Sequence, residues 1–120
     1  MVGTMQQRPR NGPVSRELEN KVFTPLAGSG GVWAYAGGGR RVLWVDAEGN
    51  FHREDGPAVD LGIVTSWYRH GLRHRVGGPA HQDAARPEEN EWFVDGVQQA
   101  PDLAWFAARG LPAPRHPLLL

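Results

Sequence analysis

The sequence predicts a mainly β fold: an antiparallel meander of short β-hairpin repeats, with a short N-terminal helix and a C-terminal capping helix. Three observations lead to this prediction. Sixteen glycines and ten prolines in 120 residues leave room for few helices and require many turns. Five tryptophans give a short chain large side chains to bury, which is untypical of disorder. Short motifs recur at a fixed spacing, as in proteins built from stacked supersecondary units.

The repeat is clearest between two copies that are shifted by 22 residues. The recurring residues are Gly49, His52, Gly56, Pro57 and Ala58 in the first copy, and Gly71, His74, Gly78, Pro79 and Ala80 in the second. Each copy begins with a tryptophan, Trp44 or Trp67. A third, partial copy begins with Trp92 and keeps Gly96, but has Gln99 where the others have histidine. We therefore expect two complete hairpin units and a closing one.

The turn residues predict the register of each hairpin. His70-Gly71 and Asp95-Gly96 are two-residue turns of type I′, which needs positive φ at both positions. The first copy has one more residue, and Ala47-Glu48-Gly49 supplies glycine for the left-handed position of a three-residue loop. These lengths place each tryptophan opposite the same point of the returning strand. The predicted cross-strand pairs are Trp44 with His52, Trp67 with His74, and Trp92 with Gln99.

A second turn follows the His-Arg pair of each complete copy, at Glu54–Pro57 and at Val76–Pro79. Proline fixes φ and removes a donor, so it suits the point where one strand ends and another begins. Residues 58–61 and 63–68 are expected to form a further strand pair about Gly62. The repeat domain is thereby assigned to residues 32–99.

The two ends of the chain differ from the repeats. Residues 1–31 are predicted to be an N-terminal arm with a short helix over 15–23, where Ser15 can cap a segment with two apolar residues on one face. Residues 100–110 are predicted to form a capping helix, because Asp102 favours the helix start and Gly110 can terminate it. Residues 111–120 are a Pro-rich tail.

WYRHGLRHRVGGPA at 67–80 and VDAEGNFHREDGPAV at 45–59 follow the pattern W-x-x-(N/D)-G-x-x-H-R-x-x-G-P-A closely. This pattern resembles a short tandem repeat in uncharacterised proteins of tailed bacteriophages and large DNA viruses. It is similar in length and hairpin logic to the membrane-occupation-and-recognition-nexus (MORN) repeat. The resemblance covers residues 44–110 and implies no activity. It implies a viral accessory protein acting on a host protein, or a minor structural part of the virion.

Composition excludes several classes of function. Thirteen basic residues balance thirteen acidic ones, so no global field attracts nucleic acid or an anionic membrane. The absence of cysteine excludes disulfides and thiolate metal sites, and fits the reducing cytoplasm of a host cell. No apolar run approaches the roughly 20 residues of a membrane span, and we expect no membrane association and no cofactor.

The histidines carry the main enzymatic alternative, a small hydrolase or nuclease that uses His52 and His74 as acid, base or metal ligands. We favour a structural role, in which each ring packs on the opposite tryptophan and hydrogen-bonds to a neighbouring turn. A metal site that joins His74 to His81-Gln82-Asp83 is not favoured. A catalytic triad of Ser66, His74 and Asp60 has no nucleophile-elbow context.

Our leading interpretation is a non-enzymatic protein-binding or scaffold module, because every recurring residue has a structural task. The candidate binding residues are Arg53, Tyr68, Arg69, Arg73 and Arg75. A nucleic-acid-binding alternative uses an arginine stripe, with Tyr68 and Trp33 as stacking surfaces. The stripe consists of Arg40, Arg41, Arg69, Arg73 and Arg75. Neutral net charge disfavours it. Homo-oligomers through exposed edge strands are compatible with either function.

Overall fold

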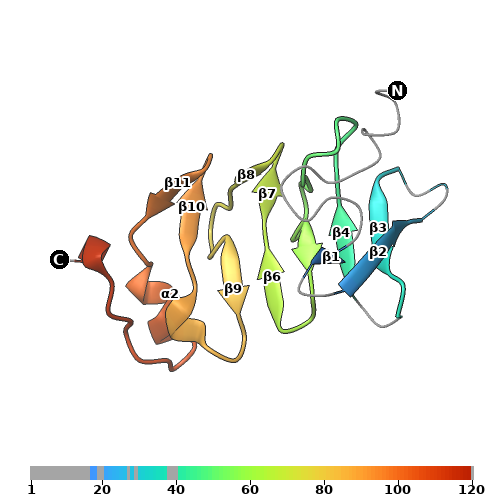
Figure 1. Ribbon diagram of the computed structural model, residues 1–120. Helices are drawn as coiled ribbons and strands as arrows, with labels where there is room; N and C mark the ends of the chain where they lie inside the picture. Colours follow the sequence, from blue (N-terminus) through green and yellow to red (C-terminus); the bar gives the residue numbers. More distant parts are fainter. Residues whose placement is uncertain (1–16, 19–20, 27, 29, 38–40, 120) are drawn as a thin grey trace.

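The computed structural model describes residues 17–18, 21–26, 28, 30–37 and 41–119. The strands stand side by side from the N-terminal end of the molecule to the C-terminal helix (Figure 1). They are β1 (Glu17–Leu18), β2 (Lys21–Pro25), β3 (Val32–Tyr35), β4 (Val42–Trp44), β5 (Val59–Asp60), β6 (Val64–Ser66), β7 (Tyr68–Arg69), β8 (Leu72–Arg73), β9 (His81–Asp83), β10 (Trp92–Val94) and β11 (Val97–Gln99).

All strand pairs are antiparallel. Seven strands form one sheet in the order β1-β2-β3-β4-β5-β6-β9, while β7–β8 and β10–β11 are separate two-stranded hairpins. This arrangement confirms the predicted mainly β, antiparallel fold built from short hairpins. The one departure from nearest-neighbour order is β9, which pairs with β6 and leaves out the β7–β8 hairpin.

In each complete repeat copy, a long strand runs through the tryptophan, and the two halves of this strand pair with different partners. Only Trp67 separates β6 from β7, and the two lie end to end (Figure 1). The N–H of Trp67 donates to the carbonyl oxygen of Ala80 (2.6 Å), and its own carbonyl oxygen accepts from the N–H of His74 (3.1 Å). Trp44 makes the same two bonds in the first copy, to Ala58 (2.7 Å) and His52 (3.0 Å). The repeated tryptophan is therefore the branch point of each unit.

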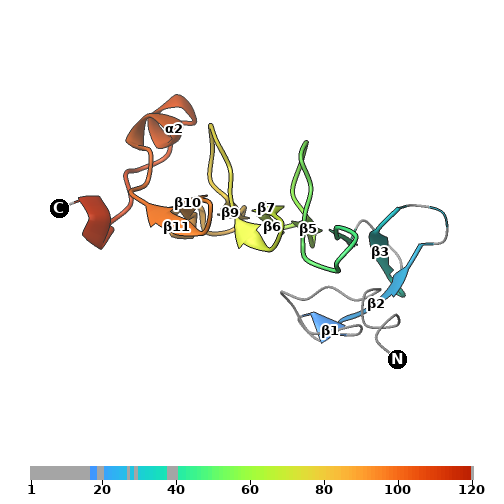
Figure 2. The same ribbon diagram turned by 90° about the horizontal axis from the view of Figure 1, so that it is seen from above.

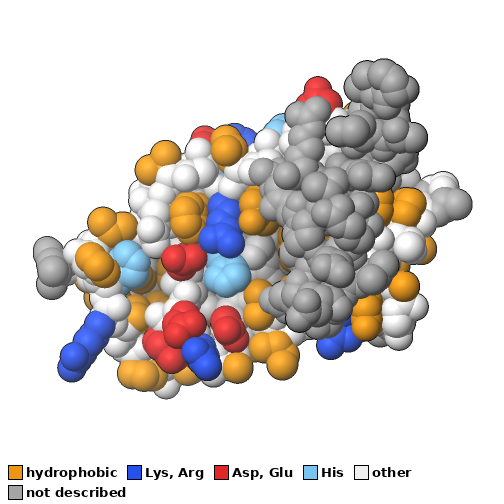
Figure 3. Space-filling model, in the orientation of Figure 1, with side chains coloured by type: hydrophobic (Ala, Val, Ile, Leu, Met, Phe, Trp, Pro, Cys, Tyr) orange, Lys and Arg blue, Asp and Glu red, His pale blue; other side chains and the backbone are white. Residues whose placement is uncertain are grey.

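Between the two partner strands of each unit the chain leaves the sheet. The two loops that result, residues 53–57 and 75–79, project from the same face, and α2 lies farther along that face (Figure 2). We call them loop 1 and loop 2, and the face that carries them the loop face. In its described part, the opposite face carries basic, acidic and histidine side chains close together, with hydrophobic side chains between them (Figure 3).

The hairpin turns have the backbone geometry that their sequences predict. His70 and Gly71 have φ of 47° and 88°, and Asp95 and Gly96 have φ of 49° and 82°. Gly49 occupies the left-handed position of the three-residue loop, with φ of 86°. The predicted cross-strand pairs follow: Trp92 faces Gln99 directly in β10–β11. The pair of strands about Gly62 is also present, as β5 and β6.

The main hydrophobic core lies at the N-terminal end of the described chain. Its buried side chains are Phe23, Trp33, Leu43, Val45, Phe51, Ala58, Val59 and Leu61. They come from β2 to β5 and from the first copy, so the repeat array is built against this core. A smaller aromatic cluster closes the other end, where Trp92 packs against Trp105 and Phe106, with ring centroids 5.7 and 5.6 Å away.

The helix predicted over residues 15–23 is wrong where the structure describes that segment. Residues 17–18 are β1 and residues 21–25 are β2, so strand structure begins well before residue 32. Phe23 pairs with Tyr35 of β3 and is 2% exposed. An isolated helix this short is marginal in water. The sheet instead offers ladder hydrogen bonds and burial of an aromatic ring, which explains why this segment forms a strand and not a helix.

The C-terminal capping helix is present as α2, Leu103–Ala108. The side chain of Asp102 caps it by accepting from the N–H of Ala104 (3.0 Å). Gly110 ends it with φ of 68°, and Phe106 is its buried residue. Two short 3-10 helices complete the described structure, η1 (Pro87–Glu89) and η2 (Pro117–Leu119) in the tail. None of the described helices has the length and apolar character needed to cross a bilayer.

Candidate functional site

An arginine lies over the tryptophan of each complete copy. The guanidinium carbon of Arg53 is 4.1 Å from the centroid of the Trp44 ring, and that of Arg75 is 4.2 Å from Trp67. Each also donates from Nη1 to a loop carbonyl, at Pro57 (3.3 Å) in loop 1. The corresponding bond in loop 2 is 3.1 Å long. The sequence interpretation placed the histidine ring on the tryptophan, but the cation–π contact belongs to the arginine.

The glycine before each proline makes room for this guanidinium. A Cβ added to Gly56 would lie 2.7 Å from Cζ of Arg53, and one added to Gly78 would lie 2.7 Å from Cζ of Arg75. Neither glycine has the positive φ that would by itself require glycine. The Arg-x-x-Gly-Pro spacing of the repeat is thus one structural device, a guanidinium held between an indole ring and a glycine backbone.

The repeated histidines join successive units. Nδ1 of His52 accepts from the N–H of His70 (3.0 Å), and Nδ1 of His74 accepts from the N–H of Asp95 (3.0 Å). A backbone N–H is always a donor, so the proton of each neutral ring sits on Nε2. These Nδ1 lone pairs are consequently not available to a metal or a substrate. The predicted bond from each histidine to a neighbouring turn is present.

Main-chain bonds complete both junctions in the same pattern. The N–H of Gly71 donates to Phe51 and that of Gly96 to Arg73, both at 2.8 Å. The arginine that follows each histidine donates its own N–H to the next unit, at 3.1 Å for Arg53 and 3.0 Å for Arg75. The array is therefore held by repeated backbone pairing, to which the histidine of each junction adds a side-chain acceptor.

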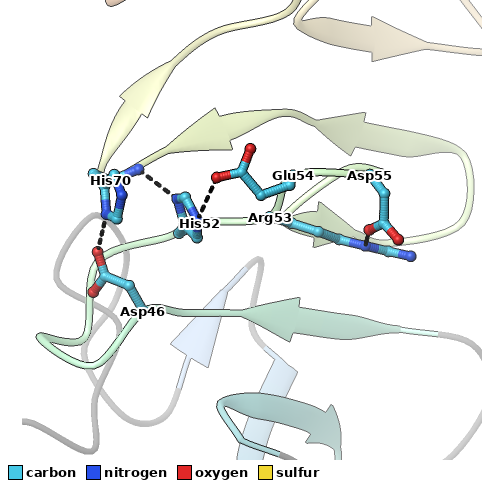
Figure 4. A network of polar contacts seen from close by, with 6 residues as sticks. All are labelled: Asp46, His52, Arg53, Glu54, Asp55 and His70. Atoms are coloured by element: carbon cyan, nitrogen blue, oxygen red, sulfur yellow. Dashed lines mark hydrogen bonds and ion pairs between the residues drawn. The ribbon is translucent and has the colours of Figure 1, made fainter.

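The first junction carries a polar network (Figure 4). The rings of His52 and His70 are stacked, with centroids 3.9 Å apart. His70 Nδ1 is 2.8 Å from Oδ2 of Asp46, and His52 Nε2 is 3.2 Å from Oε2 of Glu54. Burial of the Asp46 carboxyl opposes its ionisation. Hydrogen bonds from His70 and from the N–H groups of Asn50 and Glu48 outweigh that effect and hold the pKa of Asp46 below its usual value.

A cleft opens between loop 1 and loop 2, and we call it the inter-loop cleft. Its volume is about 200 Å³. The lining residues are Arg53, Glu54, Trp67, Tyr68, Arg69, His74, Arg75 and Val76. Four of the five candidate binding residues thus meet at one cavity. Arg73 is the exception: its guanidinium donates to the hydroxyl of Tyr68 (3.3 Å) and pairs with Glu91 (3.3 Å).

The arginines of the cleft differ in how their charge is balanced. Arg53 pairs with Asp55 (3.1 Å) and Arg69 with Asp95 (2.8 Å). Arg75 has no carboxylate partner among the described residues. Burial lowers the pKa of the Arg75 guanidinium, and the positive charge of Arg109 lowers that pKa further. The second copy therefore holds an uncompensated cation at the edge of the cleft.

The other sites considered from sequence are not assembled. Ser66 is 4% exposed and its hydroxyl lies 2.7 Å from Nδ1 of His81, so it is not paired with His74. Asp60 accepts from the N–H of Gly62 (3.0 Å). Within the described ranges, no group of three histidine or carboxylate side chains is placed to hold a metal ion.

The arginine stripe is likewise not continuous. Arg40 lies outside the described residues, and Arg41 covers the ring of Tyr35, 5.6 Å from its centroid. Arg69 and Arg73 are each paired with a carboxylate. The surface near Arg69 and Arg73 therefore carries charges of both signs, whereas nucleic-acid binding requires a continuous basic surface.

Sequence reasoning missed Arg109, Asp46 and the packing of His70. The side chain of His70 is 63% exposed, and its ring stacks on that of His52 in the preceding unit. The sequence did carry a signal that His70 is more than a turn residue. The equivalent first turn residue of the third copy is Asp95, so both units place a polar side chain there. Comparison of the chain with protein-family models, curated proteins and solved structures finds no match.

Proposed function

We propose that the protein is a non-enzymatic protein-binding module and that its partner docks on the loop face. One observation carries the proposal: the recurring tryptophans, histidines, arginines and glycines are all used inside the units or at their junctions. What remains for function is the surface that these residues hold in place. Two rigidly based loops flanking a cleft form such a surface.

The loop face also offers the mixed chemistry typical of interfaces. Trp67 and the arginines are residue types enriched in binding hot spots. Val76 belongs to loop 2 and is 80% exposed, although an aliphatic side chain is costly to leave in water. A partner that covers Val76 would also exclude water from Arg75 beside it, which strengthens charged contacts.

The resemblance of the repeat to viral tandem repeats supports a more specific form of the proposal. In that form, the protein is a phage or virus accessory protein, or a minor virion part, and its partner is a host or virion protein. Affinity capture identifies the partner protein, and the amount of that protein retained by each variant is then quantified.

The experiment compares the wild-type protein with Val76→Glu on the loop face and Ile63→Glu at the β5–β6 turn. Both side chains are largely exposed, at 80% and 62%, so the two variants are matched in chemistry and in effect on folding. Capture of one protein by wild type and Ile63→Glu, with loss in Val76→Glu, supports the proposal. Equal retention by both variants, or no capture at micromolar concentration together with turnover of a substrate, would contradict it.

A further inference from the structure

The two complete copies differ in the loop that holds the guanidinium. Loop 1 contains Glu54 and Asp55, and the equivalent positions of loop 2 are Val76 and Gly77. In loop 1 the carboxylate oxygen Oδ1 of Asp55 lies 3.1 Å from Nε of Arg53. Loop 2 keeps the guanidinium, the tryptophan and the proline carbonyl bond, but has no side chain that takes the place of the carboxylate.

A second arginine, Arg109, influences Arg75, which has no acidic partner among the described residues. Arg109 is close enough for its charge to act on Arg75. Its guanidinium carbon is 4.0 Å from the centroid of Trp105, and its Nη1 donates to the carbonyl oxygen of that same residue (3.0 Å). No carboxylate of the described residues forms an ion pair with either arginine. The charge of Arg109 therefore acts on Arg75, and each guanidinium is held over its own indole ring.

We propose that Arg75 binds a carboxylate side chain of the protein partner, which occupies on Arg75 the position that Asp55 takes on Arg53, and that the positive charge of Arg109 favours this binding. This inference rests on the proposed function and names the chemistry of the partner: an acidic segment with an apolar residue next to the acid. The acid balances the charge of the Arg75 guanidinium, and the apolar neighbour covers Val76. Arginine suits this task because its planar donors match a carboxylate.

A carboxylate is favoured over a phosphate because the first copy already shows one at the same guanidinium edge. In loop 1, Oδ1 of the short Asp55 side chain occupies the position next to Nε of Arg53. A phosphoserine peptide serves as the competing probe in the test.

The test is an NMR titration of the full chain with an acetylated and amidated Glu-Val-Glu-Val-Glu peptide, followed at the arginine Nε–H and tryptophan Nε1–H signals. A Gln-Val-Gln-Val-Gln peptide controls for apolar binding. We expect the Arg75 and Trp67 signals to move only with the acidic peptide. Arg75→Gln should weaken that binding by about tenfold, the size expected for a hydrogen bond to a charged group. Arg109→Gln should weaken it in the same direction.

The repeat supplies matched controls. Arg53→Gln removes the same tryptophan contact and the same proline carbonyl bond from loop 1, together with the ion pair to Asp55, so it should destabilise the fold at least as much as Arg75→Gln. It should weaken peptide binding less than Arg75→Gln, because Asp55 already balances the charge of Arg53. Asp55→Asn should expose the guanidinium of Arg53 and create a second peptide site. Equal weakening in Arg53→Gln and Arg75→Gln would overturn the inference, as would tighter binding of the phosphoserine peptide than of the acidic one.

The outcome is separable from that of the proposed function. If wild type binds no acidic peptide while the captured protein is still lost in Val76→Glu, the carboxylate inference fails and the binding module stands. If the peptide binds as expected but capture does not depend on Val76, the carboxylate site stands and the docking of a protein on the loop face fails.

Discussion

The substitution Gly78→Ala tests whether the guanidinium of Arg75 is held between an indole ring and the glycine backbone. The new Cβ would lie 2.7 Å from Cζ, 2.9 Å from Nη1 and 3.0 Å from Nε of Arg75, all closer than van der Waals contact allows. The guanidinium lies at the end of a flexible side chain, so the least costly response is for it to move away from its place over Trp67. It then loses the cation–π contact and the bond to the carbonyl oxygen of Pro79.

The magnitude follows from these two losses. A cation–π contact contributes about 0.5–2 kcal/mol. A hydrogen bond from a charged donor contributes about 1.5–3 kcal/mol, and less where water can replace it. Alanine in place of glycine returns about 0.4–1 kcal/mol by restricting the unfolded chain. We expect Gly78→Ala to lower the free energy of unfolding by about 1–3 kcal/mol. For a domain of this size that corresponds to a fall in melting temperature of roughly 4 °C per kcal/mol.

A double-mutant cycle separates this mechanism from a general effect of alanine in the loop. In an Arg75→Ala background there is no guanidinium to displace, so Gly78→Ala should be neutral or slightly stabilising. Urea denaturation followed by tryptophan fluorescence gives the four free energies of unfolding. The reasoning is refuted if Gly78→Ala costs as much in the Arg75→Ala background as in wild type. Gly56→Ala with Arg53→Ala repeats the cycle in the first copy.

Three further perturbations test the turns, the junctions and the polar network. Gly71→Val and Gly96→Val should each lower the free energy of unfolding by at least about 1–2 kcal/mol in thermal melts, because a β-branched residue resists φ of 88° or 82°; an unchanged melting temperature in both would refute the I′ register. His52→Ala and His74→Ala should each cost about 1 kcal/mol by removing an acceptor, while His52→Asn, whose amide oxygen can replace Nδ1, should cost less; calorimetry should find no change in Zn²⁺ uptake. Asp46 has a pKa in the folded state below the usual 3.8, so the folded state binds fewer protons than the unfolded one, and the stability from Asp46 is full above that value and is lost as pH falls below it. Asp46→Asn should flatten the decline of stability in that acid range, and an unchanged decline would argue against the assignment.

The hairpins were predictable from sequence because their conformation is decided locally. Asp95-Gly96 and His70-Gly71 adopt positive φ at both positions, since a two-residue loop between antiparallel strands leaves few other conformations. The capping helix was predictable for the same reason: Asp102 satisfies an N–H of the first turn, and Gly110 can take the left-handed conformation that ends a helix.

The segment around Phe23 shows where local reasoning fails. Its sequence is compatible with a short amphipathic helix, and the pattern of two apolar residues cannot exclude a strand. The choice is made by β3, which offers Tyr35 as a partner and a core that buries the Phe23 ring. The free energy gained from these non-local contacts is larger than the helix propensity of a few residues. It cannot be read from the sequence of residues 15–23, because the partners lie elsewhere in the chain.

By itself, then, the sequence determined the units: where each strand turns, which tryptophan faces which point of the returning strand, and where the array closes. The tertiary structure alone decided what the recurring side chains do. It placed Arg53 and Arg75 over the tryptophans and turned Nδ1 of His52 and His74 to the next unit. It also brought Arg109 near enough for its charge to lower the pKa of Arg75. Turn geometry depends on the φ and ψ of two or three adjacent residues. These contacts instead join groups eight or nine positions apart within a unit, or 18 or more positions apart in adjoining units, and their meeting is fixed only when each unit folds and the units stack.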